Sequence, residues 1–190
     1  MHSNLNRIIS KILQPIPDKL YLKCIFYLRM KKRLNLKNPM SFNEKIQWLK
    51  LYDRKEIYHT IVDKCEVKKY VSQKIGEEYI IPTIGIWKST NSIDINTLPA
   101  SFVIKATHDS GGVYICKDKS NFNFDDCYRN LERTLKHDFY LNSREWAYKG
   151  VESRIIAEKF LDDNDLKDYK FFCFNGKCKI FKIDFDRDTK

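Results

Sequence analysis

The side chain with the clearest chemical potential is Lys105, which closes an apolar run. The run FVIK spans 102–105, the small polar segment ATHDSGG follows it, and a second apolar run, VYIC, spans 113–116. A lysine that ends a buried strand must reach solvent or meet an anion, because a buried, unpaired ammonium group is strongly disfavoured. Gly111 and Gly112 let backbone N–H groups approach a phosphate closely. The pattern is typical of an anion-binding loop, and equally of an exposed hairpin with a lysine at its edge.

Three better-known motifs do not account for this loop. The sequence has no G-x-x-x-x-G-K-[ST] segment, which excludes a Walker A loop. A strand pattern follows the glycines where a Rossmann dinucleotide loop requires a helix. His108-Asp109-Ser110 contains the letters of a hydrolase triad, but adjacent residues do not form a proton relay and no G-x-S-x-G elbow is present.

Further charged residues occur on extended segments nearer the C-terminus. Asp168 and Lys170 are two residues apart, so they share one face of a strand. They suit either a same-face ion pair or contacts with ribose hydroxyls and phosphates. Glu158 follows the apolar residues 155–157 and offers acceptors for an amino group, although a charge at a strand end has the same appearance.

The elements that must position these groups follow from capping and periodicity. Ser41 with Glu44 forms a capping box, and Asp63 precedes a helical pattern that Gly76 ends. Residues 1–75 are therefore predicted to be helical, including a helix from Asp18 to the basic residues 29–33. Asn175-Gly176 predicts a two-residue β-hairpin turn. The remaining predictions are a helix at 124–139 and extended segments at 79–82, 84–87, 102–105, 113–116, 154–161, 167–174 and 177–185.

Composition bounds the class of protein. The chain has 190 residues, of which 43% are hydrophobic, enough for a core of ordinary size. No run approaches the roughly 18 apolar residues of a membrane span, and the N-terminus lacks a signal-peptide pattern. The six cysteines show no C-x-x-C pair or zinc-type spacing, which predicts reduced, mostly buried thiols. We expect a cytoplasmic protein.

The net charge of +10 is unevenly distributed. Residues 1–75 hold 17 Lys and Arg against 6 Asp and Glu, whereas residues 76–190 hold 18 against 19. The basic cluster at 29–33 suits a solvated helix end, and it also suits contact with an anionic membrane at its inner face. We expect no nucleic-acid partner, because the aromatic residues are not interleaved with basic residues in a recognition motif.

The order of several segments resembles the TupA-like group of the ATP-grasp superfamily, named from teichuronopeptide synthesis. The matching segments are NPMSFNEKIQWLKLYDR (38–54), D-K-x-x-x-K (63–68), IIPTIGIW (80–87), FVIKATHDSGG (102–112), RIIAEKFL (154–161) and DYKFFCFNGK (168–177). The resemblance implies an α+β protein in which a helical N-terminal region precedes a partial ATP-grasp fold of two small α+β lobes. It implies a basic helical region at 1–75, a first lobe with the glycine loop at 76–161, and an incomplete second lobe at 162–190.

The resemblance assigns the phosphates of ATP to the first part of the site. In ATP-grasp proteins the nucleotide lies between the two lobes, and a loop of small residues folds over its phosphates. Lys64 and Lys105 would bind those phosphates, and Ser110, Gly111 and Gly112 would form the loop. Taken alone, Lys64 could equally be a surface lysine of a helix.

The same resemblance assigns binding of the nucleoside to residues nearer the C-terminus. Glu158 would accept the adenine amino group, and the backbone near Phe160 and Leu161 would complete the adenine site. Asp168 would take ribose hydroxyls while Lys170 points along the phosphates. The resemblance thus predicts a cofactor-binding set of ten residues: Lys64, Lys105, Ser110, Gly111, Gly112, Glu158, Phe160, Leu161, Asp168 and Lys170. It predicts no catalytic or metal-binding residue within the chain.

The family pattern continues beyond the strand at 177–185, and that further part carries the acidic residues that hold Mg²⁺. We therefore expect ATP and Mg²⁺ as cofactors, with the metal ligands outside the 190 residues. Such a chain would bind nucleotide without turnover. The uncovered outer strand would also favour self-association.

The resemblance implies a ligase of cell-surface polysaccharide biosynthesis. Full-length relatives are thought to activate a carboxylate as an acyl phosphate and capture it with an amine, which would join an amino acid to a sugar acid of a capsular glycan or its precursor. Two alternatives remain. The chain could be a non-catalytic basic module that docks on a membrane or anionic polymer through residues 1–75, or a sugar transferase of the same pathway, although it shows no D-x-D motif.

Overall fold

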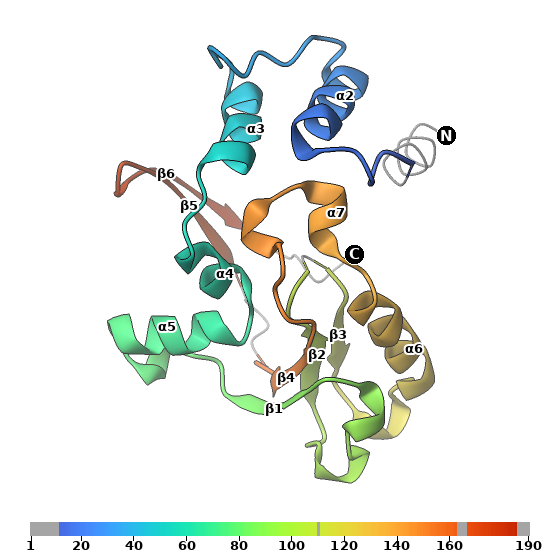
Figure 1. Cartoon of the computed structure of the whole chain (residues 1–190). Coiled ribbons are helices and arrows are strands. Elements are labelled where there is room, and N and C mark those ends of the chain that lie inside the picture. The colour runs from blue at the N-terminus through green and yellow to red at the C-terminus, as the bar shows by residue number, and fades with distance from the viewer. Residues whose placement is uncertain (1–11, 110, 163–166, 186–190) are drawn as a thin grey trace. The chain divides into compact units, whose positions relative to one another are not determined.

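The structure is a computed structural model that describes residues 12–109, 111–162 and 167–185 (Figure 1). It divides into two compact units, Met1–Lys159 and Phe160–Lys190. Both contain regular structure, and helices together with antiparallel sheets confirm the predicted α+β class. The predicted boundary at residue 75, between a helical region and a first lobe, stays a prediction. None of the helices in the described residues is long and apolar enough to cross a membrane.

Four described α-helices precede the first strand, and the ends of two of them follow the capping signals. They are α2 (Asp18–Met30), α3 (Phe42–Tyr52), α4 (Ile57–Val62) and α5 (Glu66–Ile75). Ser41 and Glu44 form the predicted capping box at the start of α3. The Asp63 carboxylate accepts hydrogen bonds from the N–H groups of Cys65 and Glu66, so it caps α5 as predicted. Gly76, at a φ of 110°, ends that helix.

A four-stranded antiparallel sheet forms the centre of the first unit. Its strands are β1 (Thr83–Trp87), β2 (Phe102–Ala106), β3 (Val113–Cys116) and β4 (Ile155–Lys159), in the order β1-β4-β2-β3. The predicted strand pair around the glycine loop is confirmed. β1 is an edge strand directly after Pro82, which agrees with the expectation that the proline marks an edge or bend.

Two predicted element boundaries are wrong. The extended segment predicted at 79–82 begins instead as a short 3₁₀ helix at Glu77–Tyr79, and the ladder starts only after Pro82, which has no N–H group to donate. The helix predicted at 124–139 divides into α6 (Phe124–Leu135) and α7 (Phe139–Ser143). The Asp138 side chain accepts a hydrogen bond from the N–H of Tyr140 and starts the second helix.

Helix α6 covers one face of this sheet, and α5 lies on the other side (Figure 1). The main core therefore forms between α6 and alternate strand residues. Its buried members are Ile93, Leu98, Phe102, Ile104, Cys116, Cys127, Leu131, Ile155 and Ala157. A smaller core joins α2 to the segment after it, through Tyr21, Leu22, Phe26, Leu34 and Leu36.

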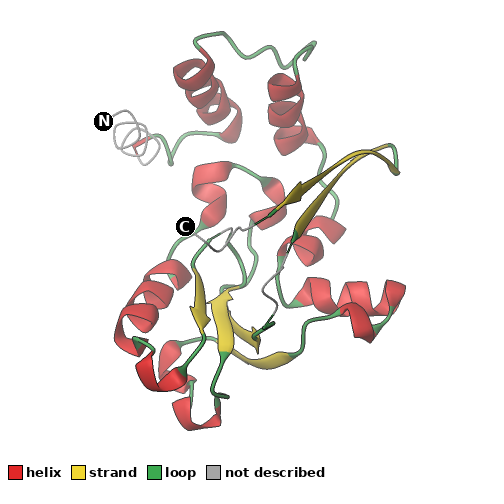
Figure 2. Ribbon diagram, turned by 180° about the vertical axis from the view of Figure 1, so that it is seen from behind, coloured by secondary structure: helices red, strands yellow, loops and turns green. Residues whose placement is uncertain are grey.

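The second unit is a β-hairpin, drawn in yellow in Figure 2 with the strands of the sheet. It consists of β5 (Asp168–Phe174) and β6 (Lys177–Asp184). Asn175 and Gly176 both have positive φ, 49° and 73°, which a two-residue type I′ turn requires. The hairpin predicted from Asn-Gly is confirmed.

Candidate functional site

The two faces of β2 explain how a lysine can close a buried strand. Phe102, Ile104 and Ala106 are buried, while Val103 and Lys105 point to the opposite face. The side chain of Lys105 is only 19% exposed. The lysine therefore leaves the apolar core intact and still lies in a sheltered position, on the face away from α6.

Glu158 of β4 meets Lys105 on that face. In the β2–β4 register, Glu158 is opposite Val103, so its side chain shares a face with Lys105. Its two oxygens are divided between two lysines: Oε2 pairs with Lys105 Nζ, and Oε1 lies 2.5 Å from Lys68 Nζ. The Lys68 ammonium group also donates to the carbonyl oxygen of Ile81 at 2.5 Å.

This arrangement keeps the carboxylate of Glu158 charged despite its burial. Burial alone would raise the pKa of Glu158, but hydrogen bonds and positive charge from Lys105 and Lys68 outweigh it and hold the pKa below the ordinary value of 4.5. Two ammonium groups thus share one carboxylate in a site that is almost closed to water. The cluster carries excess positive charge, which favours an anionic ligand.

Lys64 lies at the exit of β2 and contacts the backbone. Its ammonium group donates to the carbonyl oxygens of Ala106, at 3.0 Å, and Asp109. Its own backbone N–H donates to the carbonyl oxygen of Thr107 at 3.2 Å. Burial lowers the pKa of Lys64 below its ordinary value of 10.5, although the charge of Asp109 opposes this effect and that of Lys105 adds to it. Lys64 therefore holds the start of the loop that follows β2.

The loop is fixed at its root and open at its glycines. His108 is buried, and its Nε2 lies 3.2 Å from the carbonyl oxygens of Thr134 and His137 at the end of α6. Gly112 has a φ of 59°, a conformation that favours glycine, and it is exposed. His108 Nδ1 and Asp109 Oδ1 are buried without a hydrogen-bond partner among the described residues. The root of the loop thus retains polar atoms that a ligand or water could satisfy.

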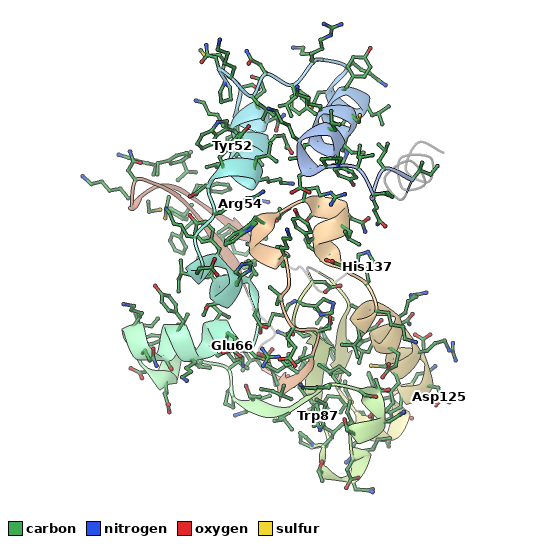
Figure 3. All side chains as sticks on the ribbon, viewed as in Figure 1. Tyr52, Arg54, Glu66, Trp87, Asp125 and His137 are labelled. Atoms are coloured by element: carbon green, nitrogen blue, oxygen red, sulfur yellow. The ribbon has the colours of Figure 1, made fainter. Side chains whose placement is uncertain are left out.

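A second ion-pair group joins α5 to β4 next to the lysines. Arg154 Nη2 lies 2.8 Å from Asp63 Oδ2 and 2.9 Å from Glu66 Oε1. Figure 3 shows Glu66 in the first turn of α5. Because Asp63 also caps α5, this contact fixes the start of the helix that carries Lys68. Arg154 and Asp63 therefore position the cluster without belonging to it.

The charged residues of the hairpin form a separate group in the second unit. Lys170 Nζ lies 2.6 Å from Asp168 Oδ2 and also pairs with Asp184. Hydrogen bonds from Lys170 and Lys182 lower the pKa of Asp184 to about 2. The same-face placement of Asp168 and Lys170 agrees with the alternation predicted for a strand.

The structure thus groups some predicted site residues and leaves others apart. Lys64, Lys105 and Glu158 come together in the first unit, and Asp168 and Lys170 come together in the second. Three of the other predicted positions, Gly111, Gly112 and Leu161, are exposed, and Phe160 is half-buried. Ser110 lies outside the described residues.

Lys68 is the site residue that sequence reasoning missed. It occurs in the D-K-x-x-x-K segment at 63–68, but the sequence pattern predicts no role for it. The available signal was its position four residues after Lys64, which suits the same side of a helical segment. Its pairing with Glu158 depends on the meeting of α5 and β4, which no local pattern reveals.

Two other features of the first unit bear on ligands. A cavity of about 460 Å³ lies between α2, α3 and the residues near Asn142, and none of the predicted site residues lines it. In residues 12–109, 111–162 and 167–185, no three His, Cys, Asp or Glu side chains gather as a metal site. Among those residues, no cluster of three such side chains is present to hold Mg²⁺ without the help of a bound phosphate.

Comparison with known proteins identifies one family. The sequence model described as TupA-like ATPgrasp matches residues 44–190. No curated protein and no solved structure matches the chain. The match includes the segments that carry Lys64, Lys68, Lys105 and Glu158.

Proposed function

The chain belongs to the TupA-like ATP-grasp family, and we propose on that basis that it binds ATP through a lysine cluster, defined as Lys64, Lys68 and Lys105 with Glu158. The observation that carries this proposal is the sharing of one buried carboxylate by Lys68 and Lys105. The α+β architecture is consistent with part of an ATP-grasp domain.

The lysine cluster suits the phosphates of ATP by its charge. Without an added anion, Glu158 neutralises only one of the two ammonium groups that contact it. A triphosphate carries several negative charges, so it can replace Glu158 as the partner of Lys68 and Lys105. The carboxylate released in this exchange becomes available to accept a hydrogen bond from the adenine amino group, which is the role that the family resemblance implies for Glu158.

The loop after β2 would complete the phosphate site. Lys64 holds the carbonyl oxygens at the root of the loop, and the backbone N–H groups near Gly111 and Gly112 would contact the phosphates. For Asp168 and Lys170 of the second unit, the role in binding ribose and phosphate stays a prediction. These assignments belong to the proposal and rest on the family resemblance.

The proposed reaction is ATP-dependent joining of a carboxylate to an amine. ATP would supply a phosphoryl group that converts the carboxylate into an acyl phosphate, which the amine then attacks. The lysine cluster would offset the negative charge that redistributes during this transfer. The carboxylate would belong to a sugar acid of a cell-surface glycan or its precursor. Mg²⁺, when bound, would neutralise part of the phosphate charge during this transfer.

Binding of ATP is tested most directly by calorimetry on matched lysine variants. The wild-type chain should bind ATP with a dissociation constant between about 1 μM and 1 mM. Lys105→Ala should weaken binding at least about tenfold, or roughly 1.4 kcal/mol. Lys117→Ala removes the same charge from an exposed position just after β3 and should leave binding unchanged. Equal affinities for wild type and Lys105→Ala would refute the proposed phosphate site.

The ligase activity needs a separate experiment. ADP should form only when ATP, a uronic acid or other sugar acid, and an amino acid are all present, and an amide product should appear in equal amount. ADP formation that does not depend on the sugar acid and the amino acid would contradict the proposed ligation. ATP binding without product from any sugar acid would contradict it too. Neither result would contradict the proposed nucleotide site.

A second candidate function is contact with an anionic membrane surface. Helix α2 exposes Leu20 and Tyr27, at 54% and 55%, near the exposed cations Lys23 and Lys31. Exposed apolar residues flanked by cations are typical of helices that lie in a lipid interface. This surface and the lysine cluster involve different residues, so both functions could occur in one protein.

Vesicle sedimentation distinguishes this second function. Binding should require an anionic lipid such as phosphatidylserine, weaken with salt, and fall in the double variant Lys23→Glu and Lys31→Glu. Lys117→Glu provides a control with a charge reversal outside α2. Equal binding to neutral vesicles, or no loss in the double variant, would exclude electrostatic docking through α2.

A further inference from the structure

The turn of the β5–β6 hairpin brings two cysteines to directly opposite positions. The register pairs Cys173 of β5 with Cys178 of β6 across the turn at Asn175-Gly176. Directly opposite residues of antiparallel strands project to the same face of the ladder. Both cysteines are free thiols, and both are exposed. The hairpin therefore presents an accessible pair of thiols on one face.

The separation that this register imposes suits a covalent bond. Opposite residues of an antiparallel pair have Cα atoms roughly 4.5–5.5 Å apart, and disulfides join cysteines whose Cα atoms are roughly 4.4–6.8 Å apart. The positive φ angles of Asn175 and Gly176 hold the two-residue turn that sets the pairing of Cys173 with Cys178. The register shifts between Phe172 and Cys173, so this pairing belongs to the end of the hairpin next to the turn. The Cys178 thiol donates to the carbonyl oxygen of Ile180 at 3.4 Å, so a bond between the two sulfurs would require it to leave that oxygen and rotate toward Cys173.

The other four cysteines provide an internal contrast. Cys65, Cys116 and Cys127 are buried, so the expectation of mostly buried thiols holds for half of the six. Burial raises the pKa of Cys65 to about 11 and that of Cys127 to about 12, which keeps both in the unreactive thiol form. Cys24 is exposed on α2, but that helix carries no second cysteine.

We propose that Cys173 and Cys178 are a redox modification site, which a low-molecular-weight disulfide converts into a cross-strand disulfide. The thiolate of one cysteine attacks the small disulfide, forms a mixed disulfide and releases one small thiol. The thiolate of the other cysteine then attacks the protein sulfur and releases the second small thiol. The protein loses two electrons and two protons, and the small disulfide gains them as two thiols.

The bond would lock the part of the chain that carries Asp168 and Lys170. A cross-strand link holds the register of β5 against β6, and a register slip by one residue would move every side chain to the other face. The site does not depend on the proposed ATP binding, because it is defined by the hairpin alone. Exposed disulfides are readily reduced, so the modification should be reversible by thiols.

The first experiment treats the full chain with oxidised glutathione and maps disulfides by mass spectrometry without reduction. We expect the loss of two hydrogen atoms, one linked peptide pair containing Cys173 and Cys178, and full reversal by a reducing thiol. Cys173→Ser and Cys178→Ser should each yield a glutathione adduct on the remaining cysteine. Cys24→Ser should oxidise like wild type. A bond that involves Cys24, an intermolecular dimer, or a wild-type chain that stops at the adduct would overturn the proposal.

The second experiment tests whether the folded hairpin presents the pair. Only four residues separate the two cysteines, so an unfolded chain can also close the ring. The oxidation equilibrium with glutathione should therefore be compared in buffer and in urea. We expect the equilibrium constant to be at least about tenfold greater for the folded chain. Equal constants in the two conditions would show that the register does not favour the bond.

Discussion

The two units each contain a group of lysines and carboxylates, and the groups differ in burial and in charge balance. In the first unit, Glu158 is 5% exposed and is shared by Lys68 and Lys105. In the second unit, Lys170 and Lys182 face Asp168 and Asp184, and their side chains are 25–61% exposed. Two ammonium groups contact one carboxylate in the first group, whereas Lys170 lies between the carboxylates of Asp168 and Asp184 in the second. An anion gains most where positive charge is both in excess and sheltered from water.

The comparison also shows where ion pairs affect stability. Exposed pairs contribute little because water and salt screen them. A buried pair is different, because removal of one partner leaves the other charged and poorly solvated. We therefore expect substitutions in the cluster around Glu158 to lower stability more than substitutions in the hairpin group.

The largest expected effect is that of Glu158→Gln on unfolding. The substitution leaves Lys68 and Lys105 close together without a carboxylate, and the free energy of unfolding should fall by about 2 kcal/mol, less than the roughly 3–5 kcal/mol of a fully buried pair because the lysines are partly exposed. Urea denaturation measures the change. Asp184→Asn in the hairpin should lower the midpoint by less, because water and salt screen the more exposed hairpin group. Equal effects of the two variants would show that burial does not distinguish the groups.

The effect of Glu158→Gln on the free energy of unfolding should depend on pH. Because the pKa of Glu158 is lower in the folded chain than its ordinary 4.5, its contribution is present above about pH 4.5 and is lost as the pH falls through the folded value. The difference in unfolding free energy between wild type and Glu158→Gln should thus be constant near neutrality and shrink in acid. Urea titrations between pH 3 and pH 7 measure it. A difference that grows toward low pH would contradict the assigned direction.

A smaller effect is expected for the affinity of ATP in Lys68→Ala. If Lys68 contacts phosphate once Glu158 is displaced, binding should weaken about tenfold, or roughly 1.4 kcal/mol. Lys69→Ala is the matched control, because it changes the neighbouring exposed lysine of α5. Calorimetry on both variants decides the point. If the two variants bind alike, Lys68 serves only the fold.

The smallest effect concerns the titration of Asp184. The hydrogen bonds from Lys170 and Lys182 lower its pKa to about 2. In Lys170→Gln the pKa should rise toward the ordinary 3.8, and stability at neutral pH should fall slightly, since a lowered carboxylate pKa stabilises the folded chain and solvent screening keeps that contribution small. Carboxyl chemical shifts followed by NMR report both values. A pKa of 3.8 for Asp184 in the wild type would show that the ion pair with Lys170 does not form in solution.

Local patterns in the sequence were sufficient for most elements. Ser41 and Glu44 predicted the start of α3 because both partners of a capping box lie within one turn. Asn175-Gly176 predicted the hairpin because only a few residues adopt the positive φ angles of its turn. The helix predicted through residue 139 was too long, because Asp138 starts a new helix at a place where the apolar spacing alone does not show a break.

The candidate site was only partly visible in the sequence. Lys105 and Glu158 were identified from their strand-end positions and from the family resemblance, and the sequence by itself determined that they lie on the faces of β-strands. Only the tertiary structure decided their partners. Lys68 meets Glu158 because the fold brings the start of α5 within side-chain reach of β4, and Lys64 contacts the carbonyl oxygens of Ala106 and Asp109 because the fold brings the end of β2 close to it. Side-chain alternation and capping are set by neighbours along the chain, whereas the pairing of charges depends on which distant elements exclude water together.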